Sequence, residues 1–330
     1  MKKNVRLIDI AEKLNLTKVS VSKALRDHPD ISAETRKKVK RVAREMGYRP
    51  NLVARSLTSQ KSQLIGVIIP KMANSFFASI VEGIYRMANQ SRYEVVLGIS
   101  LENEKLEKKH IESMLNMRVD GLLVSITEQT RTPDRFEIVR QMGIDLVFFD
   151  RGFANSGFTY LRVDNYESTK KGVLHLINSG VQKIAHLSGY EHVEIGRERK
   201  AGYLEALKES GIHMPPQAIV EGGFNEKDGY AGFERLLKEY GKPEAIFAVT
   251  YPVALGALEY MKDHGIDPGE IPILAFGSSE FNKHLANPFI CIEQPTYELG
   301  RRAFEQIIKE MNAKSKPSPE IIQLTSEIIS

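Results

Sequence analysis

Short, almost entirely apolar segments alternate with amphipathic segments from residue 63 to the end of the chain. Seven of them predict β-strands: LIGVIIP (64–70), YEVVLGIS (93–100), GLLVSI (121–126), LVFFD (146–150), KIAHLS (183–188), AIFAVT (245–250) and IPILAF (271–276). Near-continuous apolar strands separated by helices are typical of parallel sheets covered on both faces. Because seven strands exceed one small sheet, we expect two doubly wound subdomains, with a ligand cleft at the carboxyl ends of their strands.

The first 46 residues predict three short helices instead. Thr17 and Ser32 are placed to cap the second and third helices, and Asn15 lies in a turn that needs left-handed backbone, which Asn tolerates well. A helix, a tight turn and a second helix rich in Ser, Thr and Lys form a helix-turn-helix, which lays its second helix in the major groove of DNA. The alternative is an ordinary three-helix bundle with a basic face.

Charge divides the chain near the same boundary. Residues 1–61 hold 16 Lys and Arg against 6 Asp and Glu, a balance of +10, and the remainder has a balance of −6. Such asymmetry favours a polyanionic partner for the amino-terminal part, although a solvated basic surface would look the same. The single cysteine, Cys291, excludes an internal disulfide framework and a cysteine-built zinc site. We expect a cytoplasmic protein without a membrane span or signal peptide.

Several motifs resemble the lactose-repressor (LacI) family of bacterial transcription factors. VRLIDIAEKLNLTKVSVSKAL, YRPNLVARSL and LIGVIIP follow the family's amino-terminal signature, and NSFFASIVEGI, VDGLLVS, FFDR, RKAGYLEAL and VALGALEYMKDHGI continue it along essentially the whole chain. The resemblance implies a small all-α helix-turn-helix domain (1–49), a hinge helix and linker (50–62), and an α/β core of periplasmic-binding-protein type (63–330). In that core, the N-subdomain is expected at about 63–162 plus 294–322, and the C-subdomain at about 163–293 plus 323–330.

The resemblance also implies a function. Family members bind a pseudo-palindromic DNA operator as homodimers, and some form tetramers. A small molecule in the cleft, commonly a sugar or sugar derivative, changes operator affinity, and either sign of the response fits this sequence. Repression is the commoner mode in the family. The resemblance implies no cofactor, no metal and no catalytic residue.

Carried over by position, the resemblance assigns DNA contacts to the second helix. Base reading falls mainly on Lys18, Val19 and Lys23, and phosphate contacts fall mostly on Thr17, Ser20 and Ser22. Lys23 stands where the family usually has arginine, and Asn15 replaces a usual glycine. Because lysine lacks the bidentate fork with which arginine grips guanine, the operator sequence does not transfer from better-known members.

In the hinge, Asn51 is expected to cap a helix that is too short to be stable alone and forms only on the operator. Leu57 matches the family's wedge leucine, which enters a central base step together with its symmetry mate. Arg55 and the Ala54 backbone would then contact the walls of the minor groove.

Six residues are assigned to the effector by the same resemblance: Phe76, Asp150, Arg199, Phe224, Tyr251 and Gln294. The alternatives are core packing for the aromatic residues and a surface salt bridge for Arg199. The sequence departs from the family's usual pattern at two places. Thr250-Tyr251 replaces a common Asn-Asp pair, and Gly277 replaces an aspartate that binds sugar or purine in other members. Loss of that carboxylate argues against a free monosaccharide held in the usual manner. A modified, larger or phosphorylated sugar, or a protein corepressor, would fit.

Two other classes of protein are alternatives for this sequence. A periplasmic-type sugar-binding protein shares the two-lobed fold, but it would carry a signal peptide and no basic amino-terminal unit. An enzyme has little support, because dinucleotide, P-loop, H-E-x-x-H and G-x-S-x-G motifs are missing. His186, Glu191, His192 and Glu194 lie close together in sequence, but no third motif completes an acid–base or metal site.

Replacing Leu57 with alanine tests the hinge assignment. Without the wedge, the central step stays stacked, so we expect Leu57→Ala to lower operator affinity by ~10-fold or more while affinity for random DNA changes little. Fluorescence anisotropy with operator and scrambled duplexes measures both affinities. Equal losses on the two duplexes would contradict the assignment, as would a hinge helix seen by NMR in the DNA-free protein.

Overall fold

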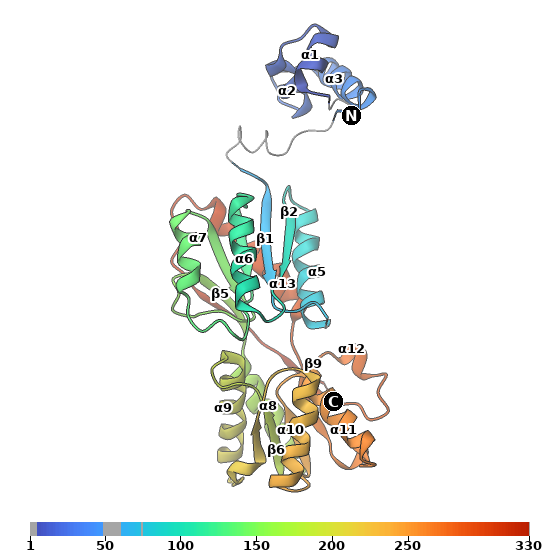
Figure 1. The fold of residues 1–330 in the computed structure, drawn as a ribbon, viewed down its shortest axis with the longest axis vertical. Coiled ribbons are helices and arrows are strands. Elements are labelled where there is room, and N and C mark those ends of the chain that lie inside the picture. Colours follow the sequence, from blue (N-terminus) through green and yellow to red (C-terminus); the bar gives the residue numbers. More distant parts are fainter. Residues whose placement is uncertain (1–4, 49–60, 74, 330) are drawn as a thin grey trace. The chain divides into compact units, whose positions relative to one another are not determined.

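The computed structural model describes residues 5–48, 61–73 and 75–329. The chain divides into two compact units, Met1–Ser62 and Gln63–Ser330 (Figure 1). The expected hinge contacts Asn51, Ala54, Arg55 and Leu57 lie outside the described residues, so their roles stay predictions.

The amino-terminal unit contains three helices, α1 (Leu7–Leu14), α2 (Lys18–Leu25) and α3 (Ala33–Glu45). Asn15 ends α1 with left-handed backbone (φ 51°), as the tight turn requires. The hydroxyls of Thr17 and Ser32 accept hydrogen bonds from the backbone N–H groups of Ser20 and Thr35, so both predicted caps are confirmed. The three helices bury a small common core: Ile10, Ala11, Val21, Ala24, Val39, Val42 and Ala43.

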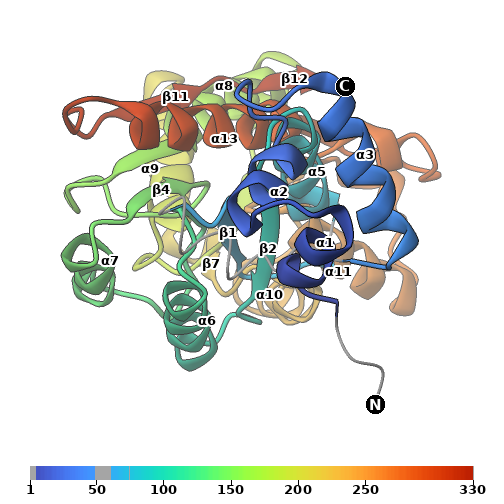
Figure 2. The same ribbon diagram turned by 90° about the horizontal axis from the view of Figure 1, so that it is seen from above.

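The first sheet of the core has the strand order β11-β5-β4-β3-β1-β2, and all of its pairs are parallel. Its strands are β1 (Leu64–Ile69), β2 (Glu94–Ile99), β3 (Gly121–Val124), β4 (Asp145–Phe149), β5 (Thr159–Val163) and β11 (Ile321–Leu324). Figure 2 shows α6 (Glu104–Asn116) and α7 (Glu137–Gln141) on one face of this sheet and α13 (Thr296–Asn312) on the other, where α5 (Ser75–Asn89) packs beside it.

The second sheet has the order β12-β10-β9-β8-β6-β7, with only the β12–β10 pair antiparallel. Its strands are β6 (Ile184–Ser188), β7 (Ile219–Glu221), β8 (Ala245–Ala248), β9 (Ile273–Gly277), β10 (Ile290–Glu293) and β12 (Glu327–Ile329). Helices α8 (Asn165–Asn178) and α9 (Glu194–Glu209) cover one face, and α10 (Glu226–Glu239) and α11 (Tyr251–Asp263) cover the other. Shorter pieces are α12 (Ser279–Asn282) and the 3-10 turns Asp134–Phe136, Pro216–Ala218 and Pro268–Glu270. The expected pair of doubly wound subdomains is thus confirmed.

The chain passes between the two sheets three times, after β5, after β10 and after β11 (Figure 1). The sequence places the last passage after about residue 322. In the structure β11 continues two residues further, to Leu324, which pairs with Val163. The carboxyl-terminal part of the second subdomain therefore begins after Leu324, because pairing with a distant strand extends β11.

Two glycines let α5 and α13 approach backbone to backbone. A Cβ atom on Gly300 would lie 2.0 Å from the Ile80 carbonyl oxygen, and one on Gly83 would lie 2.3 Å from the Tyr297 carbonyl oxygen. Neither backbone can yield as a side chain could, so both positions require glycine.

Gly300→Ala is therefore expected to lower the free energy of unfolding by about 1–3 kcal/mol, the usual cost of overpacking. Gly232, in α10, is the matched control, because its added Cβ would lie 3.6 Å from the nearest atom, a normal contact. There, Gly232→Ala should stabilise by about 0.5–1 kcal/mol through helix propensity. Urea unfolding followed by circular dichroism compares the two, and equal effects would argue against the close backbone approach.

Candidate functional sites

The amino-terminal half of α2 presents the residues expected to touch DNA. Lys18 and Val19 are exposed, Val19 at 65%, whereas Val21 is fully buried against the other helices. The Thr17 and Ser20 hydroxyls lie 2.8 Å apart, which holds both at the start of the helix. An apolar side chain left this exposed beside a lysine suits contact with base edges, where thymine methyl groups are apolar.

Lys23 is not free in this conformation. Its Nζ lies 2.6 Å from Oδ2 of Asp30, in the loop between α2 and α3. The hydrogen bond from Lys23 lowers the pKa of the Asp30 carboxyl, and His28 adds to the effect. Any base contact by Lys23 must therefore replace an ion pair within the unit.

The core holds a cleft of about 500 Å³ between its two subdomains, and all six predicted effector residues line it. Phe76 lies in the first turn of α5, and Asp150 directly follows β4. From the second subdomain come Arg199 in α9 and Tyr251 at the start of α11. Several other lining residues, such as Lys71, Glu102 and Thr250, lie just after the carboxyl ends of strands, which is where open parallel sheets bind ligands.

Arg199 is 3% exposed and held from several sides. Its Nε donates to Asn165 Oδ1 at 2.9 Å, and its Nη1 donates to the Val249 carbonyl at 2.5 Å. The guanidinium lies 3.5 Å from the centroid of the Phe276 ring, a cation–π contact. Burial lowers the pKa of Arg199 to about 9, which leaves it charged at neutral pH. Arg199 makes no ion pair with any residue that the structure describes, so the surface salt bridge weighed as an alternative is not what it forms.

Asp150 and its neighbours form the charged wall of the cleft. Asp150 is 6% exposed and adopts a positive φ of 59°; it accepts a hydrogen bond from the Ser125 hydroxyl, and burial raises the pKa of its carboxyl. Arg151 donates through Nη1 to Glu102 Oε1 at 2.9 Å. Glu102 follows β2 with a φ of 55°. Strained backbone at such positions is common at ligand sites.

Lys71, Glu102 and Arg151 are among the charged lining residues that were not predicted from the sequence. Each follows the carboxyl end of a predicted strand, so the strand-end rule contained the signal that would have found them. Lys71 also hydrogen-bonds Asn225 Oδ1 across the cleft.

The unusual glycine at position 277 has a steric explanation. A Cβ atom there would lie 2.3 Å from Cδ2 of Tyr251, so the tyrosine ring fills the space that a side chain at position 277 would need. Gly189 plays the same part for Phe224, whose ring would lie 2.2 Å from an added Cβ. In the second subdomain, aromatic rings therefore form the cleft wall at the place where other family members have a carboxylate.

Comparison with known proteins decides the family. Residues 6–51 match the family described as bacterial regulatory proteins, lacI family. Residues 62–329 match the periplasmic binding proteins and sugar binding domain of the LacI family. The chain belongs to the LacI family. This makes it a DNA-binding transcriptional regulator and not an enzyme.

Relatives of this LacI-family protein cover nearly its whole length. Catabolite control protein A of Priestia megaterium is 31% identical over 98% of both chains. The repressor CytR of Escherichia coli (strain K12) is 29% identical over 93% of this chain and 89% of its own. Among solved structures, the lac repressor dimer bound to operator and the anti-inducer ONPF has a TM-score of 0.87 at 25% identity, covering 99% of this chain and 98% of that one.

The residues around LSGYE do not form an acid–base site in this LacI-family chain. His186 is buried, stacks on Phe247 at 4.4 Å and donates through Nδ1 to its carbonyl; burial lowers the pKa of His186 to about 3. Glu191 pairs with Lys200, and Glu194 pairs with Arg162. No group of three or more His, Cys, Asp or Glu suited to a metal occurs among residues 5–48, 61–73 and 75–329. Over the same residues, no helix is long and apolar enough to cross a membrane.

Asp30→Asn tests whether the ion pair restrains Lys23. Removing the carboxylate frees the ammonium for DNA, so operator affinity should rise severalfold, with a steeper salt dependence. Glu12→Gln is the matched control, because it removes one negative charge from an exposed position of α1 without breaking a pair among the described residues. Anisotropy at several salt concentrations compares them. Equal gains would mean that only net charge matters.

Proposed function

We propose that this protein is a repressor that acts in the cytoplasm as a homodimer. Its affinity for the operator is controlled by a sugar-like small molecule that binds in the core cleft. The observation that carries the proposal is the joining of two sites in one chain. The lacI-type unit has an exposed Lys18–Val19 at the start of its second helix, and the sugar-binding core has a cleft lined by the buried Arg199, which makes no ion pair with any described residue.

The charges of the first unit support DNA binding. A balance of +10 in residues 1–61 favours phosphate contacts, which provide affinity without sequence information. Sequence reading then falls on Lys18, Val19 and Lys23. In a dimer, two such helices would meet successive major-groove half-sites about one helical turn apart.

The residues that line the cleft suit a ligand that has a polar or charged end and a ring. Arg199 and Arg151 offer guanidinium donors for hydroxyl, carboxylate or phosphate oxygens, and Asp150 offers an acceptor. Tyr251, Phe224 and Phe76 offer aromatic faces on which a ring can stack. At about 500 Å³ the cleft exceeds the need of a bare monosaccharide. We infer a substituted, larger or phosphorylated sugar.

Ligand binding would act through the relative placement of the two subdomains. Polar contacts already cross between them: His192 with the Glu128 carbonyl at 3.0 Å, and Arg162 with Glu198 at 2.6 Å. A ligand that contacts both subdomains would favour one arrangement of the subdomains over another. It shifts the equilibrium between the two arrangements only as far as its affinities for them differ.

Selection from a random DNA library with the full chain tests the DNA-binding half. We expect enrichment of a pseudo-palindrome whose binding weakens steeply with salt. Enrichment of no sequence, with binding equal to that of random DNA, would defeat the proposal. A thermal-shift screen of the same protein with sugars, sugar phosphates, nucleosides and uronates then identifies the effector.

Arg199→Ala tests whether the effector response and operator binding depend on different residues. Because Arg199 lines the cleft of the core, the variant should keep effector-free operator affinity while the effector-induced change falls by ~10-fold or more. Arg235→Ala, on the exposed side of α10, removes an arginine outside the cleft and should behave as wild type. Loss of operator binding in folded Arg199→Ala protein would show that the residue serves the core and not the ligand.

A further inference from the structure

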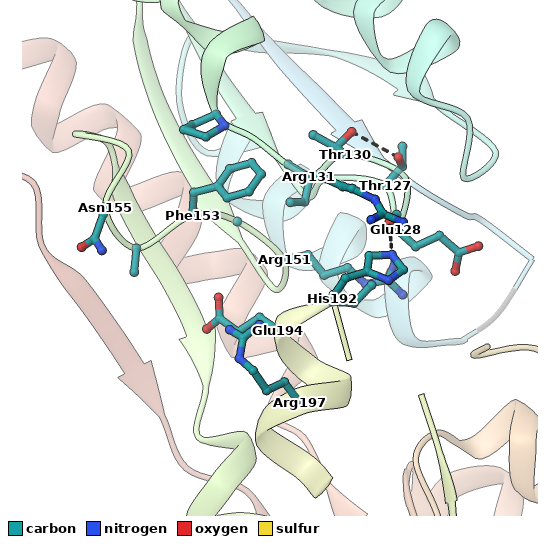
Figure 3. A pocket seen from close by; sticks show the side chains of 15 residues that line it. Thr127, Glu128, Thr130, Arg131, Arg151, Phe153, Asn155, His192, Glu194 and Arg197 are labelled. Carbon is teal, nitrogen blue, oxygen red and sulfur yellow. Dashed lines mark hydrogen bonds between the residues drawn. The ribbon is translucent and has the colours of Figure 1, made fainter. Parts of the chain in front are cut away.

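A second cavity, of about 360 Å³, lies in the core outside the effector cleft (Figure 3). Residues within 126–133 and 151–155 line it from the first subdomain, and residues 192–194 and 197 line it from the second. Like the cleft, it is therefore bounded by both subdomains.

The first turns of α9 and the side chain of Arg151 separate this second cavity from the cleft. Arg151 lines both spaces. On α9, Glu194 and Arg197 line the second cavity, whereas Ile195 and Arg199 line the cleft. A group bound on one side of this wall would touch the residues that shape the other side.

Positive groups outweigh negative ones in the second cavity. Arg131, Arg151 and Arg197 line it; Arg151 is paired with Glu102 and Asp150, but neither Arg131 nor Arg197 makes an ion pair with any part of the chain that the structure describes. Of the two acidic residues, Glu194 is already paired with Arg162. Glu128 is the other, and burial raises the pKa of its carboxyl.

Two sets of hydrogen-bond donors remain available there. Helix α9 spans 16 residues and begins after Val193, which gives it no side-chain cap, so backbone N–H groups of its first turn stay uncapped beside the cavity. Independently, Nε of Arg151, a residue that lines both cavities and is only 7% exposed, has no hydrogen-bond partner, and its nearest ion-pair contact is Asp150 Oδ2 at 3.9 Å. A buried donor of this kind is costly unless something accepts from it. Figure 3 shows Arg151 and His192 among the side chains that line the cavity.

The rim of the cavity is held in place from behind. Glu107, which is fully buried, accepts hydrogen bonds from the Thr127 backbone N–H and the Thr130 hydroxyl, both at 2.8 Å, and from Arg135 at 3.2 Å. This fixes the segment that carries Glu128 and Arg131 before any ligand arrives. Preorganised donors of this kind favour binding because little order is lost.

We infer that the second cavity binds a small organic anion, a phosphate ester or carboxylate, between Arg131, Arg151, Arg197 and the first turn of α9. Phe153 and Pro133 supply an apolar wall for its carbon skeleton. Because the anion would bridge both subdomains and press on the shared wall, it changes the affinity of the cleft for its effector, and the effector changes anion affinity by the same factor. The binding stands by itself, and only this coupling rests on the proposed function.

Isothermal titration calorimetry of the full chain tests the site with glycerol 3-phosphate, succinate and inorganic phosphate, and with glycerol as the neutral control. The decisive variant is Arg131→Gln with Arg197→Gln, which removes two exposed charges and leaves the fold intact. We expect wild type to bind one of the anions with a dissociation constant of ~1 mM or lower, and the double variant to bind at least ~10-fold more weakly. Arg235→Ala, which lies outside both cavities, should bind the anion as wild type does.

The basic amino-terminal unit also attracts anions, so the comparison of variants decides the outcome. If Arg199→Ala abolishes anion binding and the Arg131→Gln, Arg197→Gln variant does not, the anion occupies the cleft and the inference is wrong. Equal binding by all variants would place the anion on the amino-terminal unit and would overturn it too. No heat with any anion at ~10 mM, well above a ~1 mM constant, would also overturn it. None of these outcomes touches the operator test, so the proposed function stands or falls separately.

Discussion

Parallel strands covered by helices on both faces leave only their ends free for chemistry. In each subdomain the faces of the sheet are filled by apolar side chains, and polar residues collect where strands stop. Three passages of the chain between the sheets join the subdomains, and residues that follow the strands of both sheets line one cleft. The position of the cleft, its charged wall and its aromatic wall all follow from this constraint.

Much of the fold was readable from apolar runs, and the failures have a common cause. The seven predicted strands all occur, but β5, β7, β10, β11 and β12 were missed. They are three to five residues long, and several carry a charged residue, such as Arg162 in β5 and Glu327 in β12. Such segments become strands by pairing with distant partners, for example Leu324 with Val163, and no local pattern contains that information.

For the sites too, some features could be predicted from the sequence and others are visible only in the fold. Motif resemblance brought six residues to one cleft, and strand ends explain why they meet. Arg151 and Glu102 follow predicted strands, so their place near the cleft was available from the sequence, but only the fold shows that Arg151 is 7% exposed. The pairing of Lys23 with Asp30 depends on a loop conformation that residue types do not determine. Gly277 looked like a lost carboxylate, whereas the structure shows space already filled by Tyr251.

The glycine contact between α5 and α13 has a mechanical consequence. Backbone resting on backbone has no side-chain rotamers to adjust, so these two helices cannot slide past each other by repacking. Helix α13 begins just after the second passage of the chain, at Thr296. We therefore expect α5 and α13 to move as one unit, so that a change of subdomain placement falls on the chain passages beside them and not on the contact between these two helices.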